Sequence, residues 1–478
     1  MERSEAEAIY AQGREPVVGV LLALAARLEA QDAQLAALAE RVEELEQRLK
    51  RDSSNSSLPP SHDPPWLGKR GRSRGTGRKQ GGQPGHSGHG RSLFPLERVT
   101  EVVEHWPQRC GCGHVFGEED REPAGEPARH QVAELPPLAV EIGEHRLQRL
   151  CCPDCGRTVR AELPTGVPRG CFGPKLEAAI AALTVRNRLS RRQLVDLLDE
   201  LFGCPIAVGT IDAILTRTAE TLEPVYDELL EQTRAADALN IDETGWYLSG
   251  EPRTLWGAFS KQTAVLRIAP DRGKQHLHGL IGDEFAGVVG SDRFSAYNSL
   301  EPERRQVCWS HLRRDFTFHA DLGSGPQETF GLDGLEVTWN VFHAWKQFQQ
   351  DGDRAGLQQR VEVIKAQMRP LLEWGSTGKR QRHVRALARN LLKIWPALWT
   401  FADVPDVDPT NNAAERGLRA AVIYRKLSLG SRSQGGERTI ERLLSADQTC
   451  RLQHRSLYGY LSDALTAKAR GDPVPTHA

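Results

Sequence analysis

Apolar residues recur at every seventh position near the N-terminus. Two interleaved series carry the repeat: Leu21, Leu28, Leu35, Val42 and Leu49 in one, and Leu24, Leu38 and Leu45 in the other, with Gln31 as its polar member. A sustained heptad repeat is typical of the contact seam of a coiled coil. We predict a coiled coil within residues 1–52 that makes the chain a homo-oligomer. A single amphipathic helix packed on the protein is the alternative.

The apolar period ends at residues 53–95, where Ser, Pro, Gly and basic residues dominate. Between Trp66 and Arg91 there are seven Lys or Arg and no acidic residue. Such a segment cannot bury a core. We predict a cationic arm that lies along DNA, because neutralising phosphates releases counterions; an inert linker is the alternative. The predicted DNA contacts are Lys69, Arg70, Arg72, Arg74, Arg78 and Lys79.

Residues 96–165 contain two close pairs of cysteines. Thiolates on two tight turns can complete a tetrahedral zinc shell, and this clustering favours metal over disulfides in a reducing compartment. The first pair is one residue narrower than the usual CxxC, so His114 or Cys151 could replace one of its ligands. The predicted ligands of a structural Zn²⁺ are Cys110, Cys112, Cys152 and Cys155.

Helical spacing returns in residues 166–234. Residues 191–202 and 209–218 read as two helices separated by a turn at 203–208, which resembles a helix-turn-helix. We predict a DNA-binding region with Arg191 and Arg192 as contacts, although many helical hairpins of this pattern do not bind DNA.

A strand-rich pattern begins at residue 235. Three runs in succession, a short helix and two further runs predict a mixed sheet covered by helices, so the fold class is multidomain α/β. Helical spacing from about 325 to 405 predicts an insertion within a domain at 235–430, followed by a C-terminal element at 431–478. Between Ser376 and Thr400 there are six basic and no acidic residues, a second candidate surface for phosphates. The predicted strand runs are 238–248, 253–260, 264–270, 287–292 and 304–312.

Three acidic residues in this domain have contexts that suggest a shared metal site. Asp242 closes an apolar run, Asp292 follows the run GVVG, and Glu415 lies where residues 409–411 would start a helix. Carboxylates from two strand ends and a helix can hold two Mg²⁺ ions, an arrangement that cuts and joins phosphodiester bonds. With ordinary pKa values near 4 they would be ionised at neutral pH, so we expect metal binding to need no tuning. Taken singly, each is more often a solvated surface group or a helix cap.

Other polar residues flank these acids. Cys308 and His311 form a CxxH pair, for which we predict a structural or DNA-positioning role, since two ligands alone seldom make a zinc site. Four basic residues after Glu415 are predicted to hold DNA phosphates, with a solvated helix face as the alternative. They are Arg416, Arg419, Arg425 and Lys426.

Charge and hydropathy bound the location of the protein. The formal net charge is −1 and the pI is about 7.0, so any nucleic-acid surface must be local. The longest apolar run, Val17 to Ala26, is shorter than the roughly 20 residues that span a bilayer. Acidic residues precede it, unlike the basic start of a secretory signal. We expect a cytoplasmic, nucleoid-associated protein without a membrane partner.

Several strings together resemble the transposases of the insertion sequence 66 family over nearly the whole chain. They include NSSLPPS, RKQGGQPGHSGH, CPDCG, NIDETGW, SDRFSAYN, CWSHLRRDF and TNNAAERGLRAAVIYRK. That family is similar to the DDE recombinases, so the resemblance implies a ribonuclease H-like catalytic domain with Asp242, Asp292 and Glu415 as its triad. It also implies two Mg²⁺ ions, for which Mn²⁺ can substitute, and accessory proteins from the same element.

The function expected from this resemblance is transposition. Such an enzyme binds the terminal inverted repeats of an insertion sequence in double-stranded DNA, cleaves the 3′ ends and transfers them to target DNA. The alternatives are a metal-dependent nuclease that does not join strands, and a DNA-binding regulator whose catalytic domain is silent.

Overall fold

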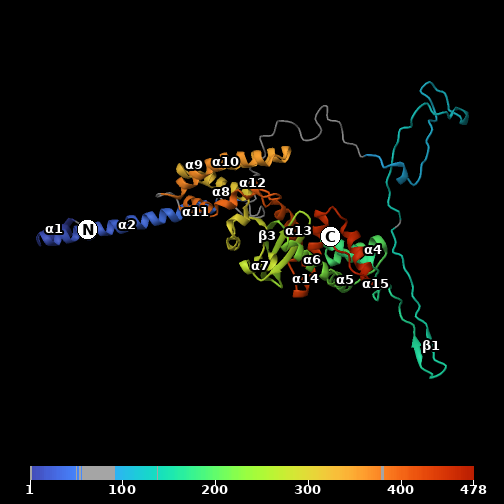
Figure 1. The fold of residues 1–478 in the computed structure, drawn as a ribbon. Coiled ribbons are helices and arrows are strands. Elements are labelled where there is room, and N and C mark those ends of the chain that lie inside the picture. The colour runs from blue at the N-terminus through green and yellow to red at the C-terminus, as the bar shows by residue number, and fades with distance from the viewer. Residues whose placement is uncertain are drawn as a thin grey trace. The chain divides into compact units, whose positions relative to one another are not determined.

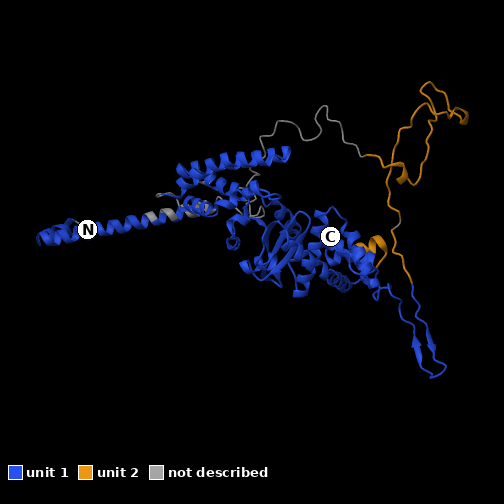
Figure 2. Ribbon diagram, in the orientation of Figure 1, with its two compact units in different colours: residues 1–68, 144–196, 205–478 blue, residues 69–143, 197–204 orange. Residues whose placement is uncertain are grey.

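The computed structural model describes residues 3–49, 51–52, 55, 92–136, 138–377 and 382–477. These fall into two compact units, one of residues 1–68, 144–196 and 205–478 and the other of residues 69–143 and 197–204 (Figure 2). The basic residues predicted for the arm lie outside the described residues: Lys69, Arg70, Arg72, Arg74, Arg78 and Lys79.

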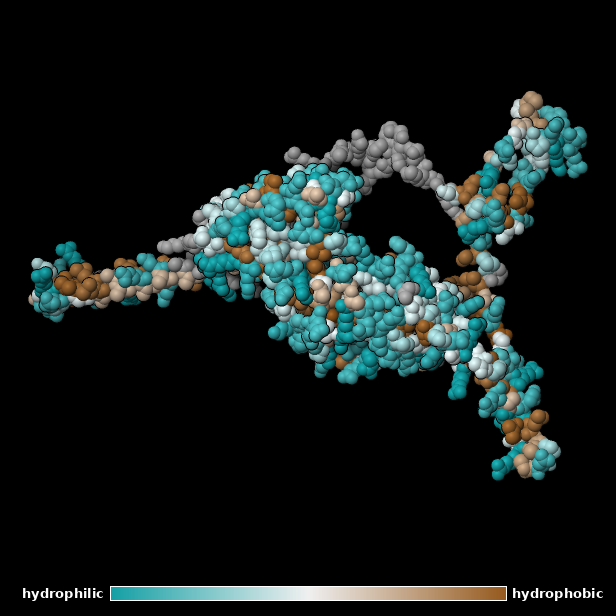
Figure 3. Space-filling view, viewed as in Figure 1, coloured by the Kyte–Doolittle hydropathy of each residue, from teal (hydrophilic) through white to brown (hydrophobic). Residues whose placement is uncertain are grey.

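The N-terminal segment is helical. Helix α1 spans Arg3–Tyr10 and helix α2 spans Arg14–Leu49 (Figure 1). Seam residues such as Leu28 and Leu35 are exposed on α2, and apolar residues are visible along this helix in Figure 3. Its length and pattern suit a coiled coil, which stays a prediction. Among the described helices, none is both long and apolar enough to cross a membrane.

A five-stranded mixed sheet forms the centre of the larger unit, in the order β5-β4-β3-β6-β7. The first three strands form an antiparallel meander, while β3 pairs β6 and β6 pairs β7 in parallel. The mixed sheet predicted from the sequence is therefore confirmed. Its strands are β3 (Ala238–Leu248), β4 (Glu251–Phe259), β5 (Ala264–Ala269), β6 (Val288–Ser291) and β7 (Arg305–Val307).

Helices that precede the sheet in the sequence and helices that follow it pack against the sheet. Helix α13 packs against β3 and β4, α6 and α14 pack against β5, and α15 packs against α3 (Figure 1). The bounds of these and neighbouring helices are α3 Pro174–Val185, α4 Arg191–Phe202, α5 Val208–Thr221, α6 Glu223–Arg234, α7 Lys274–Ile281, α13 Asn412–Ser428, α14 Gln434–Leu452 and α15 Leu457–Arg470.

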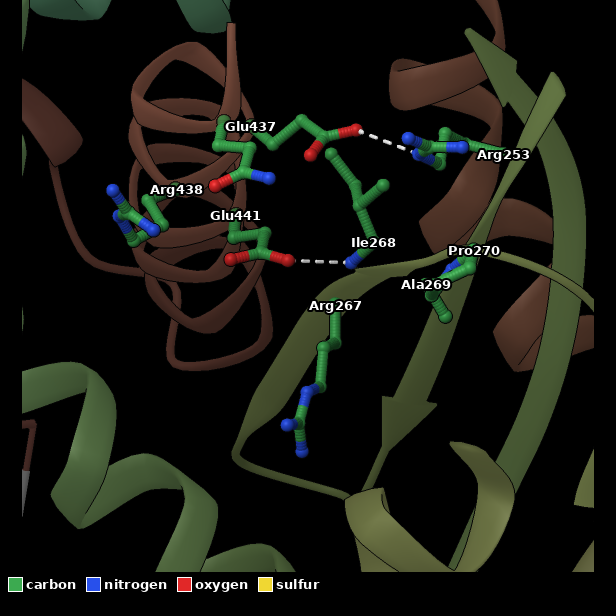
Figure 4. Close-up of a pocket in the computed structure, with 9 residues that line it drawn as sticks. Arg253, Arg267, Ile268, Ala269, Pro270, Glu437, Arg438 and Glu441 are labelled. Atoms are coloured by element: carbon green, nitrogen blue, oxygen red, sulfur yellow. Dashed lines mark hydrogen bonds and ion pairs between the residues drawn. The ribbon is translucent and has the colours of Figure 1, made fainter. Parts of the chain in front are cut away.

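Helix α14 satisfies the free edge of β5 with side chains. Alternate backbone amides of the edge strand donate to residues spaced four apart on the helix, namely Ala264 to Thr449, Leu266 to Ser445 and Ile268 to Glu441, at 2.6–3.1 Å. Figure 4 shows the last of these bonds beside an open pocket of about 290 Å³. An uncovered edge strand would present unpaired amides to other chains, so α14 removes this hazard.

The predicted insertion is helical. Its helices enclose a hydrophobic core together with α8 (Trp309–Leu322). In this core the ring centroids of Trp309 and Trp399 lie 5.2 Å apart, and the Trp309 indole donates a 2.8 Å hydrogen bond to the Leu398 carbonyl. Helix α9 approaches α8 closely because Gly334 leaves room for the ring of Phe316. The remaining helices are α9 (Pro326–Asp351), α10 (Arg354–Ser376), α11 (Arg382–Lys393) and α12 (Thr400–Asp403).

Candidate functional site

The parallel pairing of β3 with β6 brings two of the predicted acids to one level of the sheet. Asn240 is the partner of Gly290, so two residues further along each strand lie Asp242 and Asp292. Parallel strands advance in step, at about 3.3 Å per residue. Asp292 directly follows β6, as predicted. Asp242 does not end its strand, because antiparallel pairing with β4 continues β3 for six more residues; that part of the prediction is wrong.

The next strand places a cysteine in the same row. Ser291 pairs with Val307, so Cys308 follows at the level of Asp292, and its backbone amide donates to the Ser291 carbonyl at 2.9 Å. Cys308 is the N-cap of α8, and His311 follows in the first turn of that helix. The CxxH pair thus lies at the carboxyl ends of the parallel strands.

Helix α13 carries the third acid to this edge. Its N-cap, Asn411, is buried and donates from its side-chain amide to the Ile241 carbonyl at 2.7 Å, while its backbone amide donates to Cys308 Sγ at 3.2 Å. Gly417 then allows close contact with β4, since a Cβ there would lie 2.2 Å from Phe259 Cε1. These contacts fix the first turn of α13, and with it Glu415.

Burial and mutual repulsion act on these acids. Burial, followed by the charges of Glu243 and Asp292, raises the pKa of Asp242 to about 7, and Glu415 adds to the effect. The expectation that metal binding needs no tuning is therefore wrong for Asp242, because its surroundings disfavour the carboxylate at neutral pH. A nearby cation would reverse this preference.

A fourth acid lies beside Asp242 within a polar network. Glu243 accepts a 2.6 Å hydrogen bond from the Tyr297 hydroxyl and forms an ion pair with Arg272. Burial raises the pKa of Glu243, and these two partners oppose the rise. Sequence reasoning missed this network. Glu243 and Tyr297 stand in the strings NIDETGW and SDRFSAYN, but nothing in their spacing connects them.

The CxxH pair has a third neighbour. Cys308, His311 and Glu415 offer ligand atoms within 4.8 Å of one another, and across the described part of the chain they form the only such group of three. Glu415 is a third candidate ligand that the CxxH spacing alone does not reveal, and the structural or DNA-positioning role of the pair stays a prediction. Burial opposes protonation of His311, but its contact with Cys308 and the charge of Glu415 raise its pKa to about 9.

Comparison with known proteins identifies the family of this part of the chain. Residues 169–439, which include the three acids and the CxxH pair, match the family model described as "Transposase IS66 family". The chain belongs to this family. Membership supports a transposase role, which implies DNA as the substrate, and such enzymes generally use divalent metals. Residues 3–92 match a second model, described as a family of unknown function.

Curated relatives of this IS66-family chain occur in Sinorhizobium fredii. The uncharacterized protein y4qI is 25% identical over 418 residues, which cover 79% of this chain and 74% of the relative. The uncharacterized protein y4hP is 23% identical over 422 residues, which cover 79% and 73%.

The basic residues of α13 in this IS66-family chain differ in whether their side chains are exposed or bound to the protein. Arg416, Arg419 and Lys426 are exposed on α13, and their spacing of three and seven residues places them on one helix face. Arg425 instead donates hydrogen bonds to β3, at the backbone carbonyl of Gly245 and at the side-chain hydroxyl of Thr244. The first three side chains are therefore better placed to meet phosphates.

The two helices predicted as a helix-turn-helix are present as α4 and α5. Arg191 is already engaged, since its guanidinium donates to Tyr424 at 3.1 Å and to Asp212 at 3.0 Å, whereas Arg192 is exposed. On the exposed face of α5, the cation Arg217 is paired with Glu177. This face has little positive charge to offer DNA.

Each predicted zinc turn of this family member forms a local hairpin. Strands β1 (Arg149–Cys151) and β2 (Thr158–Arg160) flank the turn with Cys152 and Cys155, where backbone amides of Cys155 and Asp154 lower the pKa of Cys152.

The other turn belongs to the second unit. Its Cys110 amide donates to the His114 carbonyl at 2.9 Å, while hydrogen bonds from the His114 backbone and from Cys110 lower the pKa of Cys112. His114 is itself paired with Asp120, with 3.2 Å between Nε2 and Oδ2. The lowered pKa of Cys112 and of Cys152 favours the thiolate at these two residues, the form that binds zinc.

Proposed function

We propose that this chain is a DDE transposase that binds the terminal inverted repeats of its element, cleaves their 3′ ends and transfers them to target DNA. Asp242, Asp292 and Glu415 are its catalytic residues. The observation that carries this proposal is the register of the two parallel strands, which sets Asp242 beside Asp292 where α13 delivers Glu415.

The fold proposed for this domain is ribonuclease H-like. Three antiparallel strands followed by two parallel ones, with an acid on the first strand and another after the fourth, support it. The helices of residues 326–403 stand between the second and third acids, so they interrupt the domain without disturbing the sheet.

The donor set fits hard divalent cations such as Mg²⁺, or Mn²⁺ in its place, because carboxylate oxygens are their preferred ligands. Glu415 Oε1 is buried and has no hydrogen-bond partner, which leaves it available as a ligand. Bound between these carboxylates, two ions would activate the attacking oxygen and stabilise the departing one. The protein holds the acids in place through Asn411 and through the buried Tyr297, whose hydroxyl donates to Glu243.

DNA binding is proposed for the exposed basic face of α13, defined by Arg416, Arg419 and Lys426. It adjoins Glu415, so phosphates held there would lie near the carboxylates. Helix α11 is a second candidate, since Arg382, Arg389 and Lys393 are exposed on it and the helix has no acidic residue. The arm at 53–95 and Arg192 remain predicted contacts.

Structural Zn²⁺ binding by Cys110, Cys112, Cys152 and Cys155 stays a proposal that rests on the sequence pattern. Both hairpins are exposed and poor in apolar residues, so metal binding would supply stability that burial does not. Zinc content measured before and after substitution of Cys152 and Cys155 by Ser tests this assignment.

The heptad seam of α2 is proposed to join two copies of the chain. Leu28→Asp with Leu35→Asp should then yield monomers in sedimentation, whereas Ala26→Asp with Ala33→Asp, on the outer face of the same heptads, should not. Equal mass for both double variants would contradict the proposal.

Incubation of the protein with labelled terminal-repeat DNA, Mg²⁺ and a target plasmid tests the main proposal. We expect metal-dependent cleavage and joining by the wild type and by Asp283→Ala, an exposed acid outside the cluster, but neither by Asp292→Ala. Nicking without joined products would instead identify a nuclease. DNA binding without cleavage would indicate a regulator, or a need for accessory proteins of the element.

A further inference from the structure

Three side chains of different chemistry meet where α8 and α13 begin. Cys308 caps α8 and His311 follows within its first turn, while Glu415 lies in the first turn of α13. The sulfur accepts the Asn411 backbone amide at 3.2 Å. Two helix N-termini and this amide therefore face the sulfur of Cys308.

Two buried atoms in this group lack hydrogen-bond partners. They are His311 Nδ1 and Glu415 Oε1, which lie 3.7 Å apart, beyond hydrogen-bond distance. Metal bonds of about 2.0–2.3 Å in tetrahedral geometry separate neighbouring ligand atoms by roughly 3.3–3.8 Å. The imidazole and the carboxylate therefore stand close to the spacing that one shared ion requires.

We propose that Cys308, His311 and Glu415 bind one Zn²⁺-class transition-metal ion. Thiolate, imidazole and carboxylate are the three donor types of zinc sites, and three protein ligands leave one position open, as in zinc sites that keep a bound water. The thiolate disfavours Mg²⁺, which prefers oxygen ligands throughout. The site goes beyond the proposed two-Mg²⁺ arrangement, because Cys308 and His311 take no part in that arrangement. Glu415 belongs to both sites.

Sharing Glu415 has a structural consequence. One of its oxygens would face the softer ion, while Oε2 lies 3.9 Å from Arg314. The ion would then hold α13 against α8 at the level of Asp292, and would orient the third acid before DNA binds.

Cobalt titration of the full chain tests the site. A variant with Cys110, Cys112, Cys152 and Cys155 all changed to Ser removes the hairpin ligands, and we expect one of the Co²⁺ ions that it binds to show a thiolate-to-cobalt charge-transfer band. The further change Cys308→Ser should abolish this band and the binding of this Co²⁺ ion. His311→Gln should lower the affinity for this Co²⁺ ion at least tenfold. Cys450→Ser, at another buried thiol, should leave both unchanged.

Three outcomes would overturn the proposal: no Co²⁺ bound by the folded four-serine variant, an identical band after Cys308→Ser, or unchanged affinity after His311→Gln. If the four-serine variant does not fold, the wild type and Cys308→Ser are compared directly, and equal stoichiometry overturns it. Failure of the proposed function is distinguishable, since Asp242→Asn should abolish cleavage while it keeps the Co²⁺ equivalent.

Discussion

The side-chain amide of Asn411 donates a 2.7 Å hydrogen bond to the carbonyl of Ile241, which lies 170 positions earlier in the sequence. Ile241 immediately precedes Asp242, and Asn411 caps the helix that carries Glu415. One buried side chain therefore couples two of the proposed catalytic acids, and it is a positioning residue because it would touch neither metal nor DNA.

Loss of this bond should damage catalysis more than DNA binding. Asn411→Ala leaves a buried carbonyl unpaired, which costs about 1–3 kcal/mol in the free energy of unfolding, and lets α13 shift. Cleavage rates should fall while affinity for terminal-repeat DNA stays constant. Asn411→Asp, equal in size but without the donor, should behave alike, and Asn412→Ala should match the wild type. Full cleavage by Asn411→Asp would contradict this role.

Gly417 should be intolerant of a methyl group. In Gly417→Ala the new Cβ would meet Phe259 at 2.2 Å, so α13 must move away from β4 and take Glu415 with it. Misplacement by about 1 Å can reduce catalysis on the order of 100-fold. Gly435→Ala, whose Cβ would meet only Ser433 Oγ at 3.8 Å, is the control. Single-turnover cleavage by the two variants measures the difference, and equal rates would rule out this positioning effect.

The basic face of α13 should account for part of the salt dependence of DNA binding. Each of Arg416→Ala, Arg419→Ala and Lys426→Ala should lower the slope of log affinity against log salt by about one, because one phosphate contact is lost. Arg369→Ala, which removes a cation paired with Glu373 on α10, should leave the slope unchanged. Fluorescence anisotropy at several salt concentrations reports the slopes, and wild-type slopes in all variants would place the DNA elsewhere.

Glu441 should make stability depend on pH. Burial raises its pKa from 4.5 to about 7, so the folded state keeps a proton that the unfolded state has lost between these values. Stability should therefore fall as the pH rises through this window, by roughly 2 kcal/mol between pH 5 and pH 8 relative to Glu441→Gln. Denaturant unfolding followed by tryptophan fluorescence measures it, with Glu284→Gln as an exposed control. A Glu441→Gln curve parallel to the wild type would contradict the assignment.

Local pattern was enough to predict most of the elements. The run 238–248 matches β3 and residues 191–202 match α4, since side-chain periodicity and turn residues act over a few positions. The helix start near Asn411 was also visible, as was the mixed character of the sheet. The strings that carry the family resemblance were likewise present in the sequence alone.

Long-range pairing decided what local pattern could not. The row of Asp242, Asp292 and Cys308 depends on the register of three strands. Burial in that row raises the pKa of Asp242, which no residue-level rule predicts.

The sequence by itself determined which residues are acidic, basic or thiol-bearing, and which segments form helices or strands. Only the tertiary structure decided that Glu415 meets Cys308 and His311, more than 100 positions earlier, and that Asn411 joins β3 to α13. The physical reason is that helix and strand formation depend on neighbours along the chain, whereas ligand geometry and pKa depend on groups that meet only after folding.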